Sequence, residues 1–571
     1  MHAGNPAPAI VFPSRPMSTQ RVTSTLVAWL LLALASSPAP SAGARAAARA
    51  RQVASPVQAI LDSGAGLSSL KLTAVDRRQL AALYGERDRL LWVDGSGQPG
   101  RNARDAMALL SAAANDGLDP RDYDVDGLAA AASRLSRSPA PASDVAAFDV
   151  ALSANTLRYL ANLHLGRADP GTMGFRLPAR EPHDFTTPLR AALHRERIPE
   201  LVDELAPSIP LYQQLRAALT RYRTLAGDRS LQAFALPAVT VRPGDPCAVV
   251  VPLSRLLDAL GDLPALASEA VSAPAYEGRV VEGMRRFQRR HGLEPDGVLG
   301  KATRAALMVP LWRRVRQIEL ALERSRWVPD IDGDRFLVVN IPMFRLWGIN
   351  PSAAPFSTDV IVGRAFTRTP VLVEEMEHVI FRPYWNVPLS IVRHEIVPAV
   401  RRDPSYLQRN DMEIVDGQSD DARIVAPTAT NLERARQGTL RIRQRPGPDN
   451  SLGLVKFVFP NDANVYLHGT PAQALFRHPR RDFSHGCIRV ADVVGLAQWV
   501  LSNRPEWTAD RILRAMNGAS PLRLNLADPI RVVLFYVTAV VTPADGAVHF
   551  VEDIYGHDAR LDAYLTRRAE S

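Results

Sequence analysis

Two segments decide how this sequence is interpreted: Tyr466-Leu-His-Gly-Thr470 and Ser484-His-Gly-Cys-Ile-Arg-Val490. They place one cysteine, Cys487, close in sequence to two histidines, with 15 residues between His468 and Ser484. A cysteine is a useful nucleophile only as the thiolate, and an ordinary thiol is mostly protonated at neutral pH. A histidine within hydrogen-bond reach can take the thiol proton and later return a proton to a leaving amine. The two segments therefore predict nucleophilic catalysis by a cysteine.

Both histidines are candidates for the base. His468 ends a predicted strand, and a base that is remote in sequence from the cysteine is the usual arrangement. His485 is two positions from Cys487, so the two side chains would share a face if the backbone there is extended. The nearby glycines allow a substrate to approach the backbone closely and would present N–H groups to a developing oxyanion. Zinc ligation by His468, His485 and Cys487 is an alternative, but it lacks a nearby carboxylate base and the spacing of a metalloprotease motif.

The sequence around these segments is rich in predicted strands. Runs of β-branched and aromatic residues bounded by Pro, Gly, Asn or Asp predict strands over 336–341, 358–362, 455–460, 465–468 and 532–540. Several short strands with few helices favour a sandwich or a barrel-like sheet. The stretch between Glu395 and Gly453 is polar and arginine-rich without strong periodicity. A loop of that length in a compact domain is usually functional, for example as a lid.

The sequence before residue 335 is mainly helical. Apolar residues at three- and four-residue spacing predict helices within 57–240, most clearly over 76–84 and 149–162. A short helix is expected over 253–260, and a further helix should stop at Gly292 before a Pro-Asp-Gly turn. The next helix should begin near Gly300 or Thr303, and another over 315–326 leads into the β-rich region.

The N-terminus has the pattern of a secretory signal peptide. Arg21 precedes an apolar run over 26–35, and small residues and prolines follow through residue 44. That run is shorter than the roughly 20 residues needed to span a bilayer. We therefore expect an exported protein with a signal peptide over 1–44, starting at Met1 or Met17, and an Ala/Arg-rich linker over 45–56. An uncleaved anchor in the inner membrane is the alternative.

The length and composition limit the classes of protein. A chain of 571 residues predicts three or four domains, and 46% hydrophobic residues exclude wholesale disorder and a multi-span membrane protein. The net charge of +9 would suit an anionic partner, but only three of the 68 basic residues are lysines. The excess charge therefore also fits an arginine-rich composition without a specific partner. Two cysteines, Cys247 and Cys487, are too few for a disulfide framework, although they would be able to pair with each other after export.

Around His468 and Cys487 the chain resembles the L,D-transpeptidases with a YkuD-type catalytic domain. Their signature is a His-Gly pair followed, after a similar interval, by Ser/Thr-His-Gly-Cys. Further stretches resemble the YcbB subgroup, namely Asn340–Pro342, Gly363 with Thr369-Pro370, Pro383–Ile391 and Asp553–Gly556. Separately, residues 287–303 resemble a small three-helix peptidoglycan-binding module, which either binds glycan or serves as a packing spacer.

The resemblance implies a multidomain α+β architecture. Its parts are a helical scaffold (57–240), a three-helix peptidoglycan-binding module (241–309), a linking helix (310–334), a mostly-β catalytic domain (335–545) with a capping insertion (395–453), and a C-terminal segment (546–571). It also implies a periplasmic location, no cofactor, no metal and no nucleic acid. The expected partners are peptidoglycan stem peptides and glycan, with cell-wall synthesis proteins as further candidates and a membrane only if the signal peptide is uncleaved.

The resemblance also implies a reaction. Cys487 would attack the carbonyl between the third and fourth residues of a stem peptide, release D-Ala, and pass the acyl group to the amine of a second stem, giving a 3→3 cross-link. His468 would be the base, oriented by the carbonyl of Gly469. Attack by water instead would give an L,D-carboxypeptidase or endopeptidase, and a non-catalytic wall-binding scaffold is the remaining alternative.

The remaining site residues are expected to assist this chemistry. The candidates for the oxyanion hole are the Tyr466 side chain and the backbone of Gly486 and Cys487. Because some YcbB-like proteins have Ser-Ser-Gly-Cys in this place, His485 is expected to support the site or contact substrate, as is Ser484. The expected substrate-binding residues are Arg489, which would hold a stem carboxylate by a bidentate pair, together with Trp385 and Asn386.

Overall fold

The structure is a computed structural model that describes residues 56–64, 67, 72–85, 89–178, 183–264, 275–328, 335–351, 355–542 and 545–570. The predicted signal peptide, and the predicted linker up to residue 55, lie outside the described residues. Within the described part of the chain, no helix has both the length and the apolar character required to cross a bilayer.

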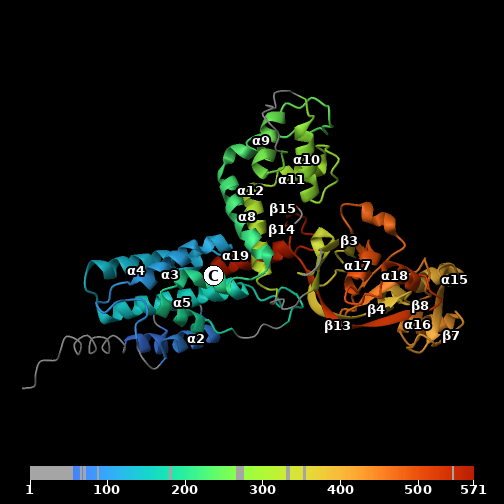
Figure 1. Cartoon of the computed structure of the whole chain (residues 1–571), viewed down its shortest axis with the longest axis horizontal. Coiled ribbons are helices and arrows are strands. Elements are labelled where there is room, and N and C mark those ends of the chain that lie inside the picture. The colour runs from blue at the N-terminus through green and yellow to red at the C-terminus, as the bar shows by residue number, and fades with distance from the viewer. Residues whose placement is uncertain are drawn as a thin grey trace, which may run out of the picture. The chain divides into compact units, whose positions relative to one another are not determined.

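The helices of the N-terminal region are arranged around α5. They are α2 (Ala74–Tyr84), α3 (Arg101–Ser111), α4 (Val125–Arg137), α5 (Ala142–Leu165), α6 (Thr186–Arg195), α7 (Leu201–Leu205) and α8 (Pro210–Gly227) (Figure 1). Helices α2, α3, α4 and α7 all contact α5, and residues from almost every side of α5 are buried. A helix that is covered all round forms the centre of a domain rather than its surface. The buried Asp149 carboxylate of α5 is satisfied by Tyr84 Oη at 2.7 Å and Trp92 N at 2.8 Å.

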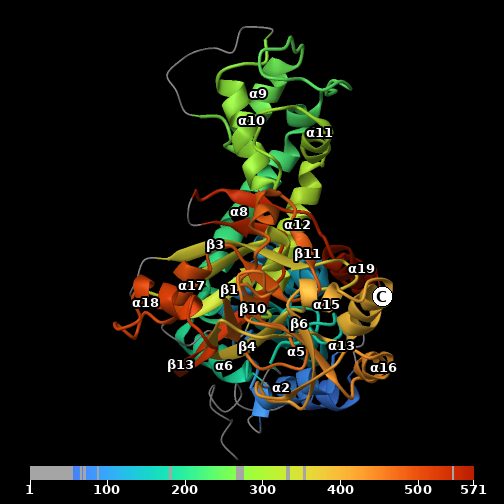
Figure 2. The ribbon, with the colours of Figure 1, turned by 90° about the vertical axis from the view of Figure 1, so that its right-hand side faces the viewer.

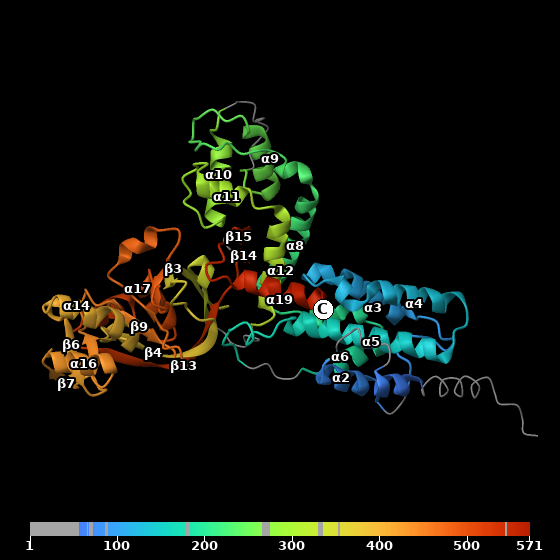
Figure 3. The same ribbon diagram turned by 180° about the vertical axis from the view of Figure 1, so that it is seen from behind.

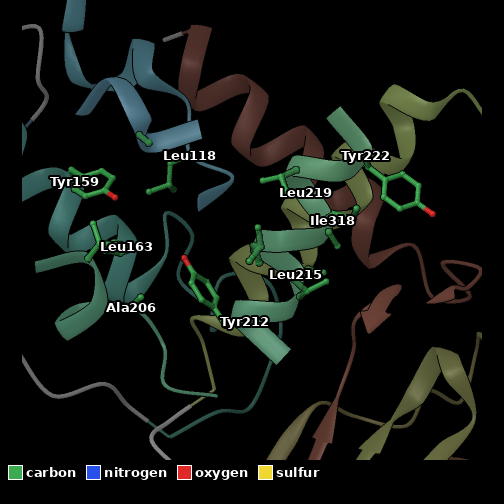
Figure 4. Packing of buried hydrophobic residues seen from close by; sticks show 14 of the residues in the cluster. Leu118, Tyr159, Leu163, Ala206, Tyr212, Leu215, Leu219, Tyr222 and Ile318 are labelled. Atoms are coloured by element: carbon green, nitrogen blue, oxygen red, sulfur yellow. The ribbon is translucent and has the colours of Figure 1, made fainter. Parts of the chain in front are cut away.

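Helix α8 packs along α12 (Leu311–Ser325), the helix that leads into the β-rich region. Figure 4 shows Leu215 and Leu219 of α8 close to Ile318 of α12, and all three side chains are fully buried. The sequence predicted this helix over 315–326. In the structure it begins four residues earlier, at Leu311, directly after Pro310. Proline is favoured at the start of a helix because the first N–H groups of a helix have no partner within it.

Helices α9 (Val250–Leu260), α10 (Arg279–Arg290) and α11 (Lys301–Leu307) form a small unit held by one glutamine. Gln288 donates to Asp296 Oδ1 at 2.9 Å and to Val298 O at 3.0 Å, and it accepts from Gly297 N at 2.8 Å. The predicted turn is thus tied back onto α10. The backbone of Gly292 is left-handed (φ +64°) just after α10, and α11 begins after Gly300 rather than at Thr303.

The β-rich region forms a closed barrel. Its strands are β1 (Phe336–Asn340), β2 (Arg345–Ile349), β3 (Phe356–Gly363), β4 (Leu372–Phe381), β9 (Val455–Val458), β10 (Leu467–His468), β11 (Asp482–Ser484), β12 (Ile488–Val490) and β13 (Leu522–Phe535). The strand order is β11-β3-β12-β10-β9-β4-β13-β1-β2, and β2 also pairs with β3, which closes the sheet. Three pairs are parallel: β1 with β13, β10 with β12, and β3 with β11. The sequence favoured a sandwich or a barrel-like sheet, and the structure has the barrel.

The barrel has an apolar core and two helices beside it. Leu337, Val379, Phe457, Leu467 and Ile488 come from five different strands and are fully buried in one cluster. Helices α17 (Val493–Val500) and α18 (Ala509–Met516) contribute to the same cluster and lie together at one side of the sheet (Figure 2).

The stretch between 395 and 453 is folded, so the expectation of a long irregular loop is wrong. It contributes to a second sheet with the order β5-β8-β6-β7, made of β5 (Trp385–Asn386), β6 (Met412–Asp416), β7 (Arg423–Val425) and β8 (Arg441–Gln444). The same stretch contains the helices α13 (Leu389–Ile391), α14 (Val397–Arg402), α15 (Tyr406–Arg409) and α16 (Ala429–Gln437). Helix α15 contacts β6, and Figure 3 shows α14 and α16 in the same region as β6 and β7. We call residues 385–444 the cap.

The cap has its own apolar core, which runs from Val387 to Ile442 and therefore starts before residue 395. The many arginines of this stretch prevented its apolar core from being recognised in the sequence. Arg443 is 3% exposed because Glu413 accepts from its Nε at 2.6 Å, so a charged residue occupies a position that sequence patterns assign to solvent.

The predicted strand over 532–540 is divided. The barrel strand β13 ends at Phe535, and β14 (Ala539–Val541) pairs with β15 (Val548–Phe550) as a separate hairpin. Helix α19 (His557–Glu570) follows, and Asp553 accepts from the N–H groups of His557 and Asp558 at its start. The ion pair between Arg324 and Asp558 links α12 to α19.

Candidate active site

A loop over 485–487 joins β11 to β12 and carries Cys487, the predicted nucleophile; we call it the nucleophile loop. Ser484 Oγ donates to Cys487 O at 2.6 Å and accepts from Gly486 N at 3.0 Å, so the serine hydroxyl closes the loop on itself. Gly486 has φ +118°, and the chain bends over 485–487. The prediction that His485 and Cys487 share a face is therefore wrong, because the backbone between them is not extended.

Strand pairing brings the other reactive groups to one face. In the parallel pair of β10 and β12, His468 lies opposite Arg489, and Ile488 N donates to Tyr466 O at 3.1 Å. In the antiparallel pair of β9 and β10, His468 lies opposite Lys456. Since side chains alternate along a strand, Lys456, Tyr466, His468 and Arg489 occupy one face, while the intervening residues point into the barrel core.

His468 is a buried neutral imidazole. Its Nδ1 lies 2.5 Å from Gly469 O, which can only accept, so Nδ1 carries the proton; the backbone of Leu452 also hydrogen-bonds to the ring. Burial lowers the pKa of His468 to about 3, and the positive charges of Arg489 and Lys456 act in the same direction. The ring is therefore unprotonated near neutral pH, which is the state that a base requires.

Gly453 is a site residue that the sequence analysis missed. Its backbone is left-handed (φ +63°), and a Cβ there would lie 2.6 Å from Thr470 N and 2.8 Å from Gly469 C. Only glycine lets this turn pack against the residues that follow His468. The one sequence signal was a glycine two residues before the strand at 455.

Cys487 is a half-buried free thiol. Burial raises its pKa, while hydrogen bonds from Tyr466 and the positive charges of Lys456 and Arg489 oppose that increase. Sγ also lies 3.7 Å from Asn464 O. Cys247 is free as well and only 4% exposed, so the two cysteines do not form a disulfide.

Tyr466 connects the cysteine to the cap. Trp385 of β5 hydrogen-bonds to the Tyr466 side chain, and Tyr466 in turn hydrogen-bonds to Cys487. Burial raises the pKa of Tyr466, so the phenol keeps its proton and remains a donor. The neighbouring Asn386 does not join this group, because it is exposed and accepts from Arg441 of the cap at 2.9 Å.

The geometry separates the oxyanion-hole candidates. The N–H of Gly486 is already donated to Ser484, so it is not free for an oxyanion. The N–H of Cys487 donates to no other group among the described residues. The Cys487 N–H is therefore the backbone donor that remains for a carbonyl oxygen attacked by Sγ, and the Tyr466 hydroxyl, which hydrogen-bonds to Cys487 in the free site, can join it by turning from the sulfur to that oxygen.

Comparison with known proteins agrees with this arrangement. Residues 334–520 match the family model described as the YkuD L,D-transpeptidase catalytic domain. The chain carries a YkuD-type transpeptidase domain. Residues 250–307 match a "Putative peptidoglycan binding domain", and residues 78–219 match a "Scaffold domain". The wider domain boundaries given above stay predictions.

A curated relative points to the same family. Over 252 residues the chain is 31% identical to a "Putative L,D-transpeptidase" of Haemophilus influenzae, and the match covers 43% of this chain. It covers 49% of the relative, so the chain spans about half the length of that protein.

In the transpeptidase domain, Arg489 is a half-buried cation. It forms no ion pair with a carboxylate among the described residues. Burial lowers its pKa, and the charge of Arg364 adds to that effect. A guanidinium in this state favours an incoming anion, because a carboxylate would relieve the cost of burying its charge.

His485 lies on the cap side of the nucleophile loop. Its Nε2 is 2.7 Å from Glu395 Oε1, at the start of the cap. Within the described ranges, no group of three His, Cys, Asp or Glu side chains is arranged to hold a metal ion. His485 thus connects the loop to the cap rather than to His468.

A buried network supports the nucleophile loop from the transpeptidase barrel. Thr369 Oγ1 donates to Gly486 O at 2.8 Å and accepts from Gly363 N at 2.9 Å. Tyr555 Oη donates to Gly363 O at 2.5 Å and accepts from Thr369 N at 3.2 Å. A Cβ on Gly363 would lie 2.0 Å from Thr367 O, so this position requires glycine. Gly363, Thr369 and Tyr555 lie in the stretches that resemble the YcbB subgroup, but the sequence indicated no role for them.

Proposed function

We propose that this protein is a peptidoglycan L,D-transpeptidase that forms 3→3 cross-links through a Cys487 acyl-enzyme. One observation carries the proposal: within a YkuD-type domain, a neutral His468 whose Nδ1 is held by Gly469 O shares one strand face with Tyr466 and Arg489 beside Cys487. That combination provides a nucleophile, a base, an oxyanion donor and an anion-binding group in one place.

The first half-reaction consumes the tetrapeptide stem. The Cys487 thiol gives its proton to His468 Nε2, and Sγ attacks the carbonyl carbon between the third and fourth residues. The Cys487 N–H and the Tyr466 hydroxyl donate to the oxyanion that forms. When the C–N bond breaks, the D-Ala amine takes the proton from His468, and a thioester remains on Cys487.

The second half-reaction forms the cross-link. The side-chain amine on the third residue of another stem attacks the thioester carbonyl and gives a proton to His468. The C–S bond then breaks, and the proton returns to the Cys487 sulfur. If water attacked instead, the same thioester would give a tripeptide, so the outcome depends on excluding water while the amine enters.

Arg489 and the cap position the substrate in this proposal. Arg489, which lacks a carboxylate partner among the described residues, binds a carboxylate of the stem peptide. Trp385 places the cap next to the nucleophile through Tyr466, and His485 does so through Glu395. The cap would therefore cover the substrate once it is bound.

We further propose that the enzyme works in the periplasm and belongs to the YcbB subgroup. The scaffold match over 78–219 and the peptidoglycan-binding match over 250–307 support the subgroup, because both precede the catalytic domain as they do there. The substrates are the peptide stems and glycan of the cell wall, and no cofactor takes part in the reaction as written.

The test is product analysis by mass spectrometry with purified full-length protein and disaccharide-tetrapeptides. We expect dimers that have lost one D-Ala. If tripeptides were the only product, the enzyme would be a hydrolase and not a transpeptidase. If the substrate stayed unchanged, the protein would be a non-catalytic wall-binding scaffold. Cys487→Ala should form no dimers, whereas Cys247→Ala, the matched control at the buried cysteine, should retain activity. Dimers made by Cys487→Ala would show that the nucleophile is wrong.

A further inference from the structure

Lys456 has no assigned part in the chemistry, yet it lies at the centre of the site. It is one of three lysines in a chain with 68 basic residues. It lies on β9 opposite His468, and its Nζ is 3.8 Å from the centre of the Tyr466 ring. Arginine serves as the cation almost everywhere else in this chain.

The ammonium of Lys456 has no carboxylate partner among the described residues, and it lies over the face of the Tyr466 ring. Burial lowers its pKa, and the principal charge that opposes this effect is the Cys487 thiolate. A half-buried cation without an anion is costly, so an anion formed at Cys487 would be its natural counterpart.

Two contacts in series join Lys456 to the sulfur. The ammonium lies over the electron-rich face of the Tyr466 ring, and the Tyr466 hydroxyl hydrogen-bonds to Cys487. A positive charge on the ring face makes the phenol a stronger donor, and a stronger donor favours a negatively charged sulfur.

We propose that Lys456 is a positioning residue whose ammonium stabilises the Cys487 thiolate through Tyr466. Before the thiol proton reaches His468, the positive charge beside the nucleophile comes from Lys456 and Arg489, because the His468 ring is neutral. The inference rests on the proposed function only in taking Cys487 as the nucleophile, and it deepens that function by assigning the residue that activates the thiol.

The charges around the site are consistent with a thiolate stabilised by Lys456 and a neutral His468. Titratable and charged groups come to the site from several elements: Tyr466 directly before β10, His468 on β10, Lys456 on β9, His378 on β4, Arg489 on β12 and Arg364 after β3. The two cations next to His468 disfavour a protonated ring. When the S–H bond breaks and the proton moves to His468 Nε2, the same cations stabilise the thiolate. They also destabilise the protonated ring, which favours release of its proton to the leaving amine.

The experiment measures the rate of Cys487 alkylation by iodoacetamide against pH, in the full-length protein, by peptide mass spectrometry. In this reaction the thiolate sulfur bonds to the methylene carbon and iodide leaves, so no peptidoglycan is needed. In Lys456→Met we expect the midpoint of the profile to rise by about one pH unit, which slows alkylation at pH 7 about tenfold. Lys456→Arg, which keeps a cation, should recover most of the rate.

Controls separate charge from structure. Lys301→Met removes the same charge from an exposed position on α11 and should leave the profile unchanged. Far-ultraviolet circular dichroism and the unfolding midpoint establish that each variant is folded, and Lys456→Gln replaces Lys456→Met if the latter is not. In a double-mutant cycle with Tyr466→Phe, the two effects should be strongly non-additive because they share one contact.

An unchanged profile in folded Lys456→Met overturns the proposal. An equal upward shift in Lys456→Met and Lys456→Arg also overturns it, because loss of charge could not then be the cause. The two proposals fail under different results. If the profile of Lys456→Met shifts but the parent forms no dimers, transpeptidation is refuted and activation of the thiol by Lys456 is supported. If the parent forms dimers but the profile of Lys456→Met does not shift, activation by Lys456 is refuted and transpeptidation is supported.

Discussion

Thr369 is a single buried hydroxyl on which the nucleophile loop depends. It is 1% exposed, accepts a hydrogen bond from Gly363 N at 2.9 Å and donates one to Gly486 O at 2.8 Å. The change Thr369→Val keeps the shape of the side chain but removes the hydroxyl. Two buried backbone groups then lose a partner that water cannot easily replace.

The magnitude follows from the number of groups left unsatisfied. Each unpaired buried group costs about 1–3 kcal/mol, so the loss of a partner by two groups should lower the free energy of unfolding by roughly 2–6 kcal/mol. Because Gly486 precedes the nucleophile, the loop should also lose its fixed position. A displacement of the sulfur by about 1 Å is enough to reduce turnover about 100-fold.

Two measurements check this prediction: denaturant unfolding of the full-length protein, and the rate of dimer formation from tetrapeptides. Thr369→Ser is the matched control, because it restores the hydroxyl, and it should recover most of both quantities. If Thr369→Val stays within about 0.5 kcal/mol of the parent and keeps its turnover, the hydroxyl does not support the loop.

Three further predictions concern the cap, the small helical unit and pH. Glu395→Gln should change the free energy of unfolding by less than about 1 kcal/mol, because its pair with His485 is largely exposed, but it should raise KM by loosening the cap; an unchanged KM would contradict this role. Arg290→Met leaves the buried Asp262 carboxylate without its partner and should cost about 3–5 kcal/mol in denaturant unfolding; a loss below about 1 kcal/mol would count against it. His468 has a folded pKa of about 3, below its unfolded value, so the unfolded chain binds more protons and the stability that His468 contributes above about pH 6.5 is lost as the pH falls. Between pH 7 and pH 4 the parent should therefore lose roughly 3 kcal/mol more than His468→Gln, and equal losses would refute the assignment of a buried neutral ring.

The candidate residues for the chemistry could be chosen from the sequence to the extent that their pattern is local. Cys487 with His468 at a fixed interval predicted a thiol nucleophile and its base, and the structure places the Nδ1 of His468 against Gly469 O as expected. The barrel was also predictable, because its strands carry β-branched runs between breaking residues. The helices were found from their three- and four-residue apolar spacing.

Other features escaped because they depend on one backbone angle or on a distant partner. Gly486 turns the chain so that His485 meets Glu395 of the cap, 90 positions away, instead of lying beside Cys487. The same bend assigns the Gly486 N–H to Ser484 and removes it from the oxyanion hole. No periodicity in the sequence encodes a single left-handed backbone conformation.

The cap was misread for a different reason. Its core is interrupted by buried charged residues such as Arg443, which Glu413 neutralises within the fold. Sequence patterns treat an arginine as a solvent-facing residue, and only the position of its partner decides otherwise. Asn386, expected to bind substrate, accepts a hydrogen bond from Arg441 of the cap, and its role with substrate stays a prediction.

The sequence by itself determined which reactive groups exist and how far apart they lie along the chain. The tertiary structure decided which of them meet and in what state of charge. Lys456 shows the difference, because nothing in its neighbourhood along the chain connects it to Cys487. The pairing of β9 with β10, and of β10 with β12, brings Lys456, His468 and the nucleophile to one face. Burial on that face then sets their pKa values, and burial is a property of the packed barrel and not of any single segment.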